Sequence, residues 1–184
     1  DKPEHLLEWI HDRADAYEPY QFSLKQPVHM YDRGELHNIQ IPSGTLTPEE
    51  RFAINEHVMQ TILMLDRLPF PEELEAVREY AGSHHEALNG GGYPRGLDAA
   101  QLSIPARILI IADIFEALTA PDRPYKSTKT LSQAIEVLYG FKQRNHIDGR
   151  IFDLFLTSGV YKRYAERFLS AEQIDEVDIS RYLG

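Results

Sequence analysis

Apolar residues recur at helical spacing along most of the chain. Positions three or four residues apart share one face of an α-helix, so this spacing predicts amphipathic helices. The segments that show it are residues 6–14, 48–65, 71–85, 105–119, 131–144, 149–158 and 161–169, with a short turn after residue 170. Alternation typical of strands does not persist for more than four residues. The pattern therefore predicts an all-α protein built as a helical bundle.

Two of these helices have a marked start. Thr47 precedes Pro48 and Glu50, which predicts a capping box. In this motif the threonine hydroxyl and the glutamate carboxylate each accept a hydrogen bond from a free backbone N–H, and proline suits the first helical position. Thr130 and Gln133 repeat the arrangement. In the helix over residues 48–65 the main apolar side chains are Phe52, Ile54, Val58, Ile62 and Leu65.

Residues 19–46 lack the helical pattern. They are rich in proline, glycine and histidine, and so predict irregular backbone with one short helix near residues 33–39. We expect the first helix, over residues 6–14, to end before Pro19, because proline interrupts a helix interior.

Composition narrows the class of protein. A chain of 184 residues with 42% hydrophobic residues can bury a substantial core as one domain. No apolar run approaches the ~20 residues of a membrane span. The net charge of −10 argues against nucleic acid as a partner, and it means that a phosphate ligand needs a local positive site. The absence of cysteine excludes disulfides and thiolate metal sites and fits a cytoplasmic location.

The most informative segment begins at the adjacent histidines His84 and His85. Two neighbouring imidazoles can face one site only where a helix ends or the backbone bends. The glycines at 90–92 supply a bend, and Pro94 then stiffens the exit and favours extended backbone at Tyr93. A rigid loop beside paired histidines suits a metal site with a substrate wall. The alternative is that the histidines only stabilise a helix C-terminus.

Two further residues are candidates for the same site. Asp113 lies within an apolar stretch, and a buried carboxylate is costly unless it is paired or bound to metal. His57 lies inside the helix over residues 48–65, where a lone histidine is usually structural or exposed. Imidazoles and a carboxylate from successive helices are suitable ligands for a divalent metal. Without sulfur ligands, iron and manganese are favoured, with zinc as the alternative.

The run over residues 84–94 resembles the signature of the HD-GYP proteins. They are a branch of the HD superfamily of metal-dependent phosphohydrolases found in bacterial signalling. The signature reads His-His-Glu, two variable residues, Asp-Gly, one variable residue and Gly-Tyr-Pro, and Asn89 stands here at the Asp position. The likeness covers roughly residues 43–140. Its other blocks are residues 44–50, His57, residues 112–119 and residues 122–126.

The resemblance implies an HD-type bundle and a set of site residues. The positions that match metal ligands are His57, His84, His85 and Asp113, and those that match substrate contacts are Gly92, Tyr93, Pro94, Arg123 and Lys126. Arginine recognises phosphate through two parallel hydrogen bonds, and lysine adds a point charge. Without the resemblance, Arg123 and Lys126 indicate a solvated loop and Tyr93 a packed aromatic. Glu86 is expected either to orient an imidazole or to be solvated at the helix end.

The resemblance also implies a domain organisation. We expect residues 1–184 to form a single HD-GYP-like domain, with a divergent segment at 1–42, the matching segment at 43–140 and C-terminal helices at 141–184. The chain begins at Asp1 instead of methionine. We therefore expect it to be a piece of a longer protein, with a sensory or receiver domain upstream.

One part of the family pattern is missing. The family's His-Asp dyad, followed by Gly-Lys, precedes the position of His57 by about thirty residues. That place holds Val28 and His29, and Asp32 stands at the lysine position. The chain's only His-Asp pair is at residues 11–12, in surroundings that do not match. Either the missing ligands lie upstream, or the site is reduced. We predict that residues 11–12 do not join the metal cluster.

The sequence leaves three functions open. The first is a signalling phosphodiesterase that cleaves cyclic di-GMP by metal-assisted hydrolysis. The second is a receptor or interaction domain that retains the shell of the site without turnover, as the missing dyad and lysine suggest. The third is a phosphohydrolase acting on another nucleotide. We predict weak or no hydrolysis of cyclic di-GMP, with some metal affinity retained.

Overall fold

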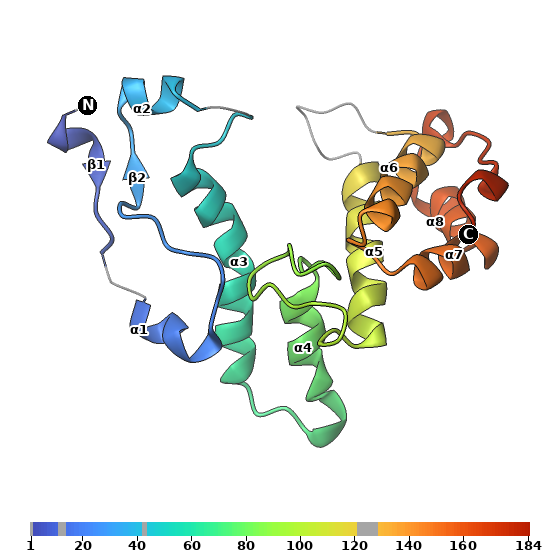
Figure 1. Cartoon of the computed structure of the whole chain (residues 1–184), viewed down its shortest axis with the longest axis horizontal. Coiled ribbons are helices and arrows are strands. Elements are labelled where there is room, and N and C mark those ends of the chain that lie inside the picture. Colours follow the sequence, from blue (N-terminus) through green and yellow to red (C-terminus); the bar gives the residue numbers. More distant parts are fainter. Residues whose placement is uncertain (1, 11–13, 42–43, 121–128) are drawn as a thin grey trace. The chain divides into compact units, whose positions relative to one another are not determined.

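The structure, a computed structural model, describes residues 2–10, 14–41, 44–120 and 129–184 (Figure 1). These residues are predominantly helical, which confirms the all-α prediction. Their contacts divide the chain into two compact units. The first comprises Asp1–His85 with Tyr93–Gly96, and the second comprises Glu86–Gly92 with Leu97–Gly184.

The described residues of the first unit form four α-helices and three short 3-10 helices. The α-helices are α1 (Ala14–Tyr17), α2 (Glu35–Ile39), α3 (Pro48–Asp66) and α4 (Ala76–Ser83). The 3-10 helices are Pro3–His5, Glu18–Tyr20 and Glu72–Leu74. Two-residue strands β1 (Leu6–Leu7) and β2 (Tyr31–Asp32) pair in antiparallel register. The short helix expected near residues 33–39 is α2.

The helix predicted over residues 6–14 is wrong for residues 6–10, where the structure describes no helix. Leu6 and Leu7 form β1, and only α1 is helical in this part of the described chain. Trp9 explains why local periodicity fails here. Its indole N–H donates to the carbonyl of Pro27 at 2.9 Å, and its ring meets that of Phe52 edge to face at 5.8 Å. Contacts with distant segments therefore outweigh the helical spacing.

Helix α3 begins as predicted and carries the core of the first unit. Thr47 Oγ1 accepts from the Glu50 N–H at 3.2 Å, and Glu50 Oε2 accepts from the Thr47 N–H at 2.9 Å. The buried apolar side chains of α3 are Phe52, Val58, Met59 and Ile62. Ile54, another apolar side chain of this helix, is 55% exposed.

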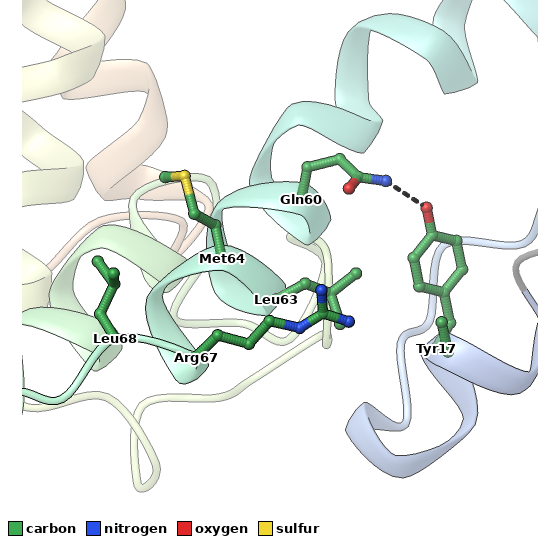
Figure 2. A pocket seen from close by; sticks show the side chains of 7 residues that line it. Tyr17, Gln60, Leu63, Met64, Arg67 and Leu68 are labelled. Carbon is green, nitrogen blue, oxygen red and sulfur yellow. Dashed lines mark hydrogen bonds between the residues drawn. The ribbon is translucent and has the colours of Figure 1, made fainter.

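Tyr17 anchors α1 to this core. Its hydroxyl donates to Glu56 Oε1 and accepts from Gln60 Nε2 at 2.7 Å. Figure 2 shows the Gln60 bond beside a hollow of about 520 Å³ that α1 and the C-terminal half of α3 line. Tyr17, Phe52 and Met59 form one buried cluster, so α1 is held by both packing and hydrogen bonds.

Helix α4 packs alongside α3 (Figure 1). It starts at Ala76, several residues later than predicted, because Glu72–Leu74 forms a separate 3-10 turn. Gly82 allows the helices to approach closely. A Cβ atom there would lie 2.7 Å from Cγ1 of Ile62, closer than real contacts allow. This approach sets the end of α4 against α3.

The second unit contains α5 (Ile104–Thr119), α6 (Leu131–Gln143), α7 (Gly149–Thr157) and α8 (Val160–Phe168), with 3-10 helices at Ala171–Gln173 and Ile179–Arg181. Thr130 and Gln133 form the predicted capping box of α6. The core lies between α5 and its neighbours. Its buried side chains include Ile110, Phe115, Ile135, Leu138, Phe152 and Leu156. Across the ranges described above, none of the helices is both long and apolar enough to cross a bilayer.

Candidate metal centre

Three histidines of the first unit converge at the end of α4. His57 lies on α3, and His84 follows the last residue of α4 with φ −66° and ψ −16°. The helix ends there, so the next residue, His85, turns toward the same point, as expected of adjacent histidines at a helix terminus. One ligand atom from each ring lies within 4.8 Å of the other two.

The three rings are arranged around a common space. Ring centroids are 5.8 Å apart for His57 and His84, 5.1 Å for His57 and His85, and 4.2 Å for His84 and His85. His57 is exposed and the other two are half-buried. Metal–nitrogen bonds are about 2.0–2.1 Å long, so small side-chain rotations would bring these atoms to one ion. The donor set fits a divalent metal.

Backbone carbonyls fix the protonation of two of these rings. Nδ1 of His57 lies 2.6 Å from the Ile54 carbonyl, and Nδ1 of His84 lies 2.7 Å from the Ala81 carbonyl. A carbonyl oxygen only accepts hydrogen bonds, so each Nδ1 must carry the proton. Each neutral ring therefore keeps its lone pair on Nε2, the atom left to bind metal. Such outer contacts commonly orient metal-binding histidines.

The loop after the histidines forms one side of this space. The Tyr93 ring stacks on His85 with centroids 4.9 Å apart and planes 25° from parallel. The Tyr93 N–H donates to the His85 carbonyl at 3.1 Å. The Pro94 carbonyl accepts from the N–H of Ser23 at 2.7 Å and from its hydroxyl at 2.9 Å. Tyr93 and Pro94 are thus held beside the cluster.

Arg95 is a residue that the sequence interpretation missed. Its Nη2 donates to the Ser83 hydroxyl at 3.2 Å, which places a positive charge next to the residue that precedes His84. The sequence feature that could have identified Arg95 is its position as a basic residue directly after Tyr93 and Pro94.

The segment between His85 and Tyr93 belongs to the second unit and is tightly built. The Glu86 side chain is fully buried, and its carboxylate accepts from the Leu97 N–H at 2.8 Å. The alternative that Glu86 is solvated at the helix end is therefore wrong, and its orientation of an imidazole stays a prediction. Gly92 lies so close to Glu86 and Ala87 that a Cβ would come within 2.3 Å of backbone. This position requires glycine for steric reasons.

The remaining predictions concern Asp113, two basic residues and the His-Asp pair. Asp113 is on α5 in the second unit and is half-buried, where full burial was expected. Its role as a ligand stays a prediction. Arg123, Lys126 and the pair at residues 11–12 lie outside the described residues.

The side chains at the expected dyad and lysine places have other partners. His29 Nδ1 lies 3.1 Å from Glu8 Oε1. Asp32 Oδ1 accepts from the Gly34 N–H at 2.8 Å, and its Oδ2 lies 3.7 Å from His37 Nδ1. Neither His29 nor Asp32 belongs to the histidine cluster.

Comparison with known proteins identifies a family and several relatives. Residues 2–151 match the HD domain family, which extends on both sides of residues 43–140. A 3'3'-cGAMP-specific phosphodiesterase of Vibrio cholerae is 35% identical over 130 residues, which are 69% of this chain and 29% of that protein. A cyclic di-GMP phosphodiesterase of Thermotoga maritima is 34% identical over 114 residues, 62% of this chain and 29% of that protein.

A third relative is a cyclic di-GMP phosphodiesterase response regulator of Xanthomonas campestris. It is 44% identical over 70 residues, which are 38% of this chain and 17% of that protein. This chain thus corresponds to less than a third of the length of these relatives.

Proposed function

Because this chain belongs to the HD domain family, we propose that it is a metal-dependent phosphodiesterase module acting on a cyclic dinucleotide. The observation that carries the proposal is the convergence of His57, His84 and His85 within 4.8 Å. Relatives that are 34–35% identical to it over 114–130 aligned residues are named as cyclic di-GMP or 3'3'-cGAMP phosphodiesterases, which supports this substrate class.

In this proposal the three histidines hold a divalent metal through nitrogen, with Asp113 as a further ligand. Nitrogen and oxygen donors favour iron or manganese, with zinc as the alternative. When bound, such a metal supplies Lewis acidity toward a phosphate and an activated water at neutral pH. The carbonyls of Ile54 and Ala81 keep two of the rings in the tautomer that this role requires.

The chain's own residues would position the substrate. Tyr93, stacked on His85, offers an aromatic surface next to the cluster on which a base can stack. Pro94 and Gly92 complete that wall. Arg123 and Lys126 would hold the phosphates, and they supply local positive charge in a chain whose net charge is −10.

A larger protein is part of the proposal. The matched region is less than a third of each relative, and one relative is named a response regulator. We therefore expect a sensory or receiver domain upstream, and a cytoplasmic location for the whole protein.

A receptor without turnover is the second candidate. The contacts of His29 and Asp32 favour it, because these residues stand where the family places a dyad and a phosphate-binding lysine. A bridging carboxylate is needed to clamp both the attacking and the leaving oxygen between two metals. Without it, phosphate binding can persist while hydrolysis is lost.

Metal analysis tests the site first. The purified protein should retain iron or manganese, and His57→Ala or His84→Ala should remove most of it. His29→Ala is the matched control, since His29 pairs with Glu8 away from the cluster. Equal metal content in all four proteins would refute the metal centre.

Activity decides between the two candidates. Cyclic di-GMP and 3'3'-cGAMP are supplied anaerobically with excess Mn²⁺ or Fe²⁺. We expect turnover below the range of about 1–10³ s⁻¹ typical of enzymes, abolished by Asp113→Ala. Binding with no turnover would establish the receptor, and absence of both binding and turnover would overturn the proposal.

A further inference from the structure

A second hollow in the first unit has a volume of about 670 Å³. It lies between the segment at residues 24–27, the C-terminal end of α2 and the first turns of α3. This volume is within the range of about 300–1,000 Å³ typical of small-molecule sites. Its apolar lining comprises Leu24, Pro27, Ile41, Leu46, Pro48 and Phe52.

The hollow lies on a different side of α3 from the histidine cluster. Arg51, Phe52 and Asn55 line it from α3. An α-helix turns by about 100° per residue, so His57 projects about 160° away from Asn55 around the helix axis. A ligand in this hollow would therefore not occupy the metal site.

The charged groups around the hollow favour an anion. Lys25 and Arg51 line it and are exposed, and neither forms an ion pair with a carboxylate of the described chain. The third basic group, His37, is already paired, with Nε2 3.0 Å from Glu49 Oε2. Two cations without an ion-pair partner among the described residues therefore lie beside an apolar floor and are available to an anion.

One polar atom in the lining also lacks a partner. Oε1 of Gln26 is buried, and no hydrogen-bond donor of the described chain reaches it. Gln26 lines the hollow. A buried acceptor left unbonded is unfavourable. A ligand that carries a hydroxyl or N–H group would satisfy it.

We propose that this hollow binds a small organic anion, with a carboxylate or phosphate on an aromatic or aliphatic body that also carries a hydrogen-bond donor. Lys25 and Arg51 receive the anion, Phe52 and Leu46 contact the apolar body, and Gln26 accepts from the donor. The site is independent of the metal centre and of the proposed hydrolysis.

The test is an NMR titration of the whole chain. The probes are 4-hydroxyphenylacetate, its uncharged amide, phenylacetate, phenyl phosphate and inorganic phosphate, monitored at the signals of Leu24, Leu46 and Phe52. We expect 4-hydroxyphenylacetate to bind, and the comparison of phenylacetate with phenyl phosphate, which both lack the hydroxyl, identifies the preferred anion. The amide and inorganic phosphate should bind at least about tenfold more weakly, since each lacks one recognised part.

Variants test the named residues. Lys25→Ala combined with Arg51→Ala should weaken binding by about tenfold or more. Arg67→Ala, an exposed arginine just beyond α3, should leave it unchanged. Gln26→Leu should remove the preference for 4-hydroxyphenylacetate over phenylacetate. No binding by any probe, equal binding of acid and amide, or full binding by the double variant would overturn the proposal. Metal content, measured in parallel, tests the histidine centre of the proposed function independently of this hollow.

Discussion

Gly92 lies against the backbone of the second unit with no room for a side chain. A Cβ at this position would lie 2.3 Å from Ala87 N, 2.4 Å from Glu86 Cα and 2.5 Å from the Glu86 carbonyl carbon. Ordinary contacts between heavy atoms are about 3.5–4.0 Å, so each distance is too short by about 1 Å or more. Backbone atoms cannot rotate away as a flexible side chain can. We expect Gly92→Ala to destabilise the fold by about 3 kcal/mol, the upper end for overpacked sites.

Gly140 provides the matched control. It lies within α6, and a Cβ there would meet only the Arg144 guanidinium, at 3.6 and 3.9 Å. Alanine is favoured over glycine in a helix interior by about 0.8–1.0 kcal/mol. The same added methyl group should therefore stabilise the protein at Gly140 and destabilise it at Gly92.

Urea denaturation followed by circular dichroism measures both changes. The midpoint should fall for Gly92→Ala and rise slightly for Gly140→Ala, with the slope m unchanged. For a chain of this size, a loss of about 3 kcal/mol lowers Tm by about 6–12 °C. A Gly92→Ala protein within about 0.5 kcal/mol of the wild type would refute the close approach.

Three other predictions concern the second unit. Thr130→Ala removes the capping hydroxyl of α6 and should lower the free energy of unfolding, measured by urea denaturation, by about 1 kcal/mol. Thr130→Ser keeps the hydroxyl and should lower it much less. Asp148 caps α7. Burial raises its pKa, but the hydrogen bonds from Arg107 and from two backbone N–H groups lower the pKa by more, so it lies below its usual value. Its stabilisation is therefore full above about pH 4 and lost as pH falls through the lower folded pKa; acid titration of Asp148→Asn should lack this step. Asn89→Asp replaces a donor to the Arg144 carbonyl with an acceptor and should lower the free energy of unfolding by about 1 kcal/mol. A urea midpoint equal to that of the wild type would contradict this.

The helices that the sequence predicted well begin with capping contacts between residues that are close together in the chain. Thr47 and Thr130 cap helices through contacts within four residues, so the sequence alone contains the whole interaction. The segment over residues 6–14 shows the opposite case. Its backbone is set by β2 and by the Pro27 carbonyl, more than fifteen residues away. Periodicity carries no information about such partners.

The metal site likewise has some features that the local sequence predicts and others that it does not. Adjacent histidines before a glycine run indicated a shared metal site, and the structure brings His84 and His85 together with His57. The features that prepare the site were beyond prediction. Gly82 allows α4 to reach Ile62, and the carbonyls of α3 and α4 select the tautomers. Each depends on tertiary packing or on backbone atoms, which are the same in every sequence.

The positions that depart from the HD-GYP pattern have structural partners of their own. Asn89 donates through Nδ2 to the Arg144 carbonyl and accepts through Oδ1 from the Gly91 N–H, and a carboxylate could do only the second. Asp32 caps the Gly34 N–H beside His37, and a lysine there could not accept that bond. Restoring the family residue at either position would break an existing contact. Single reversions to the family residue should therefore lower stability without raising turnover.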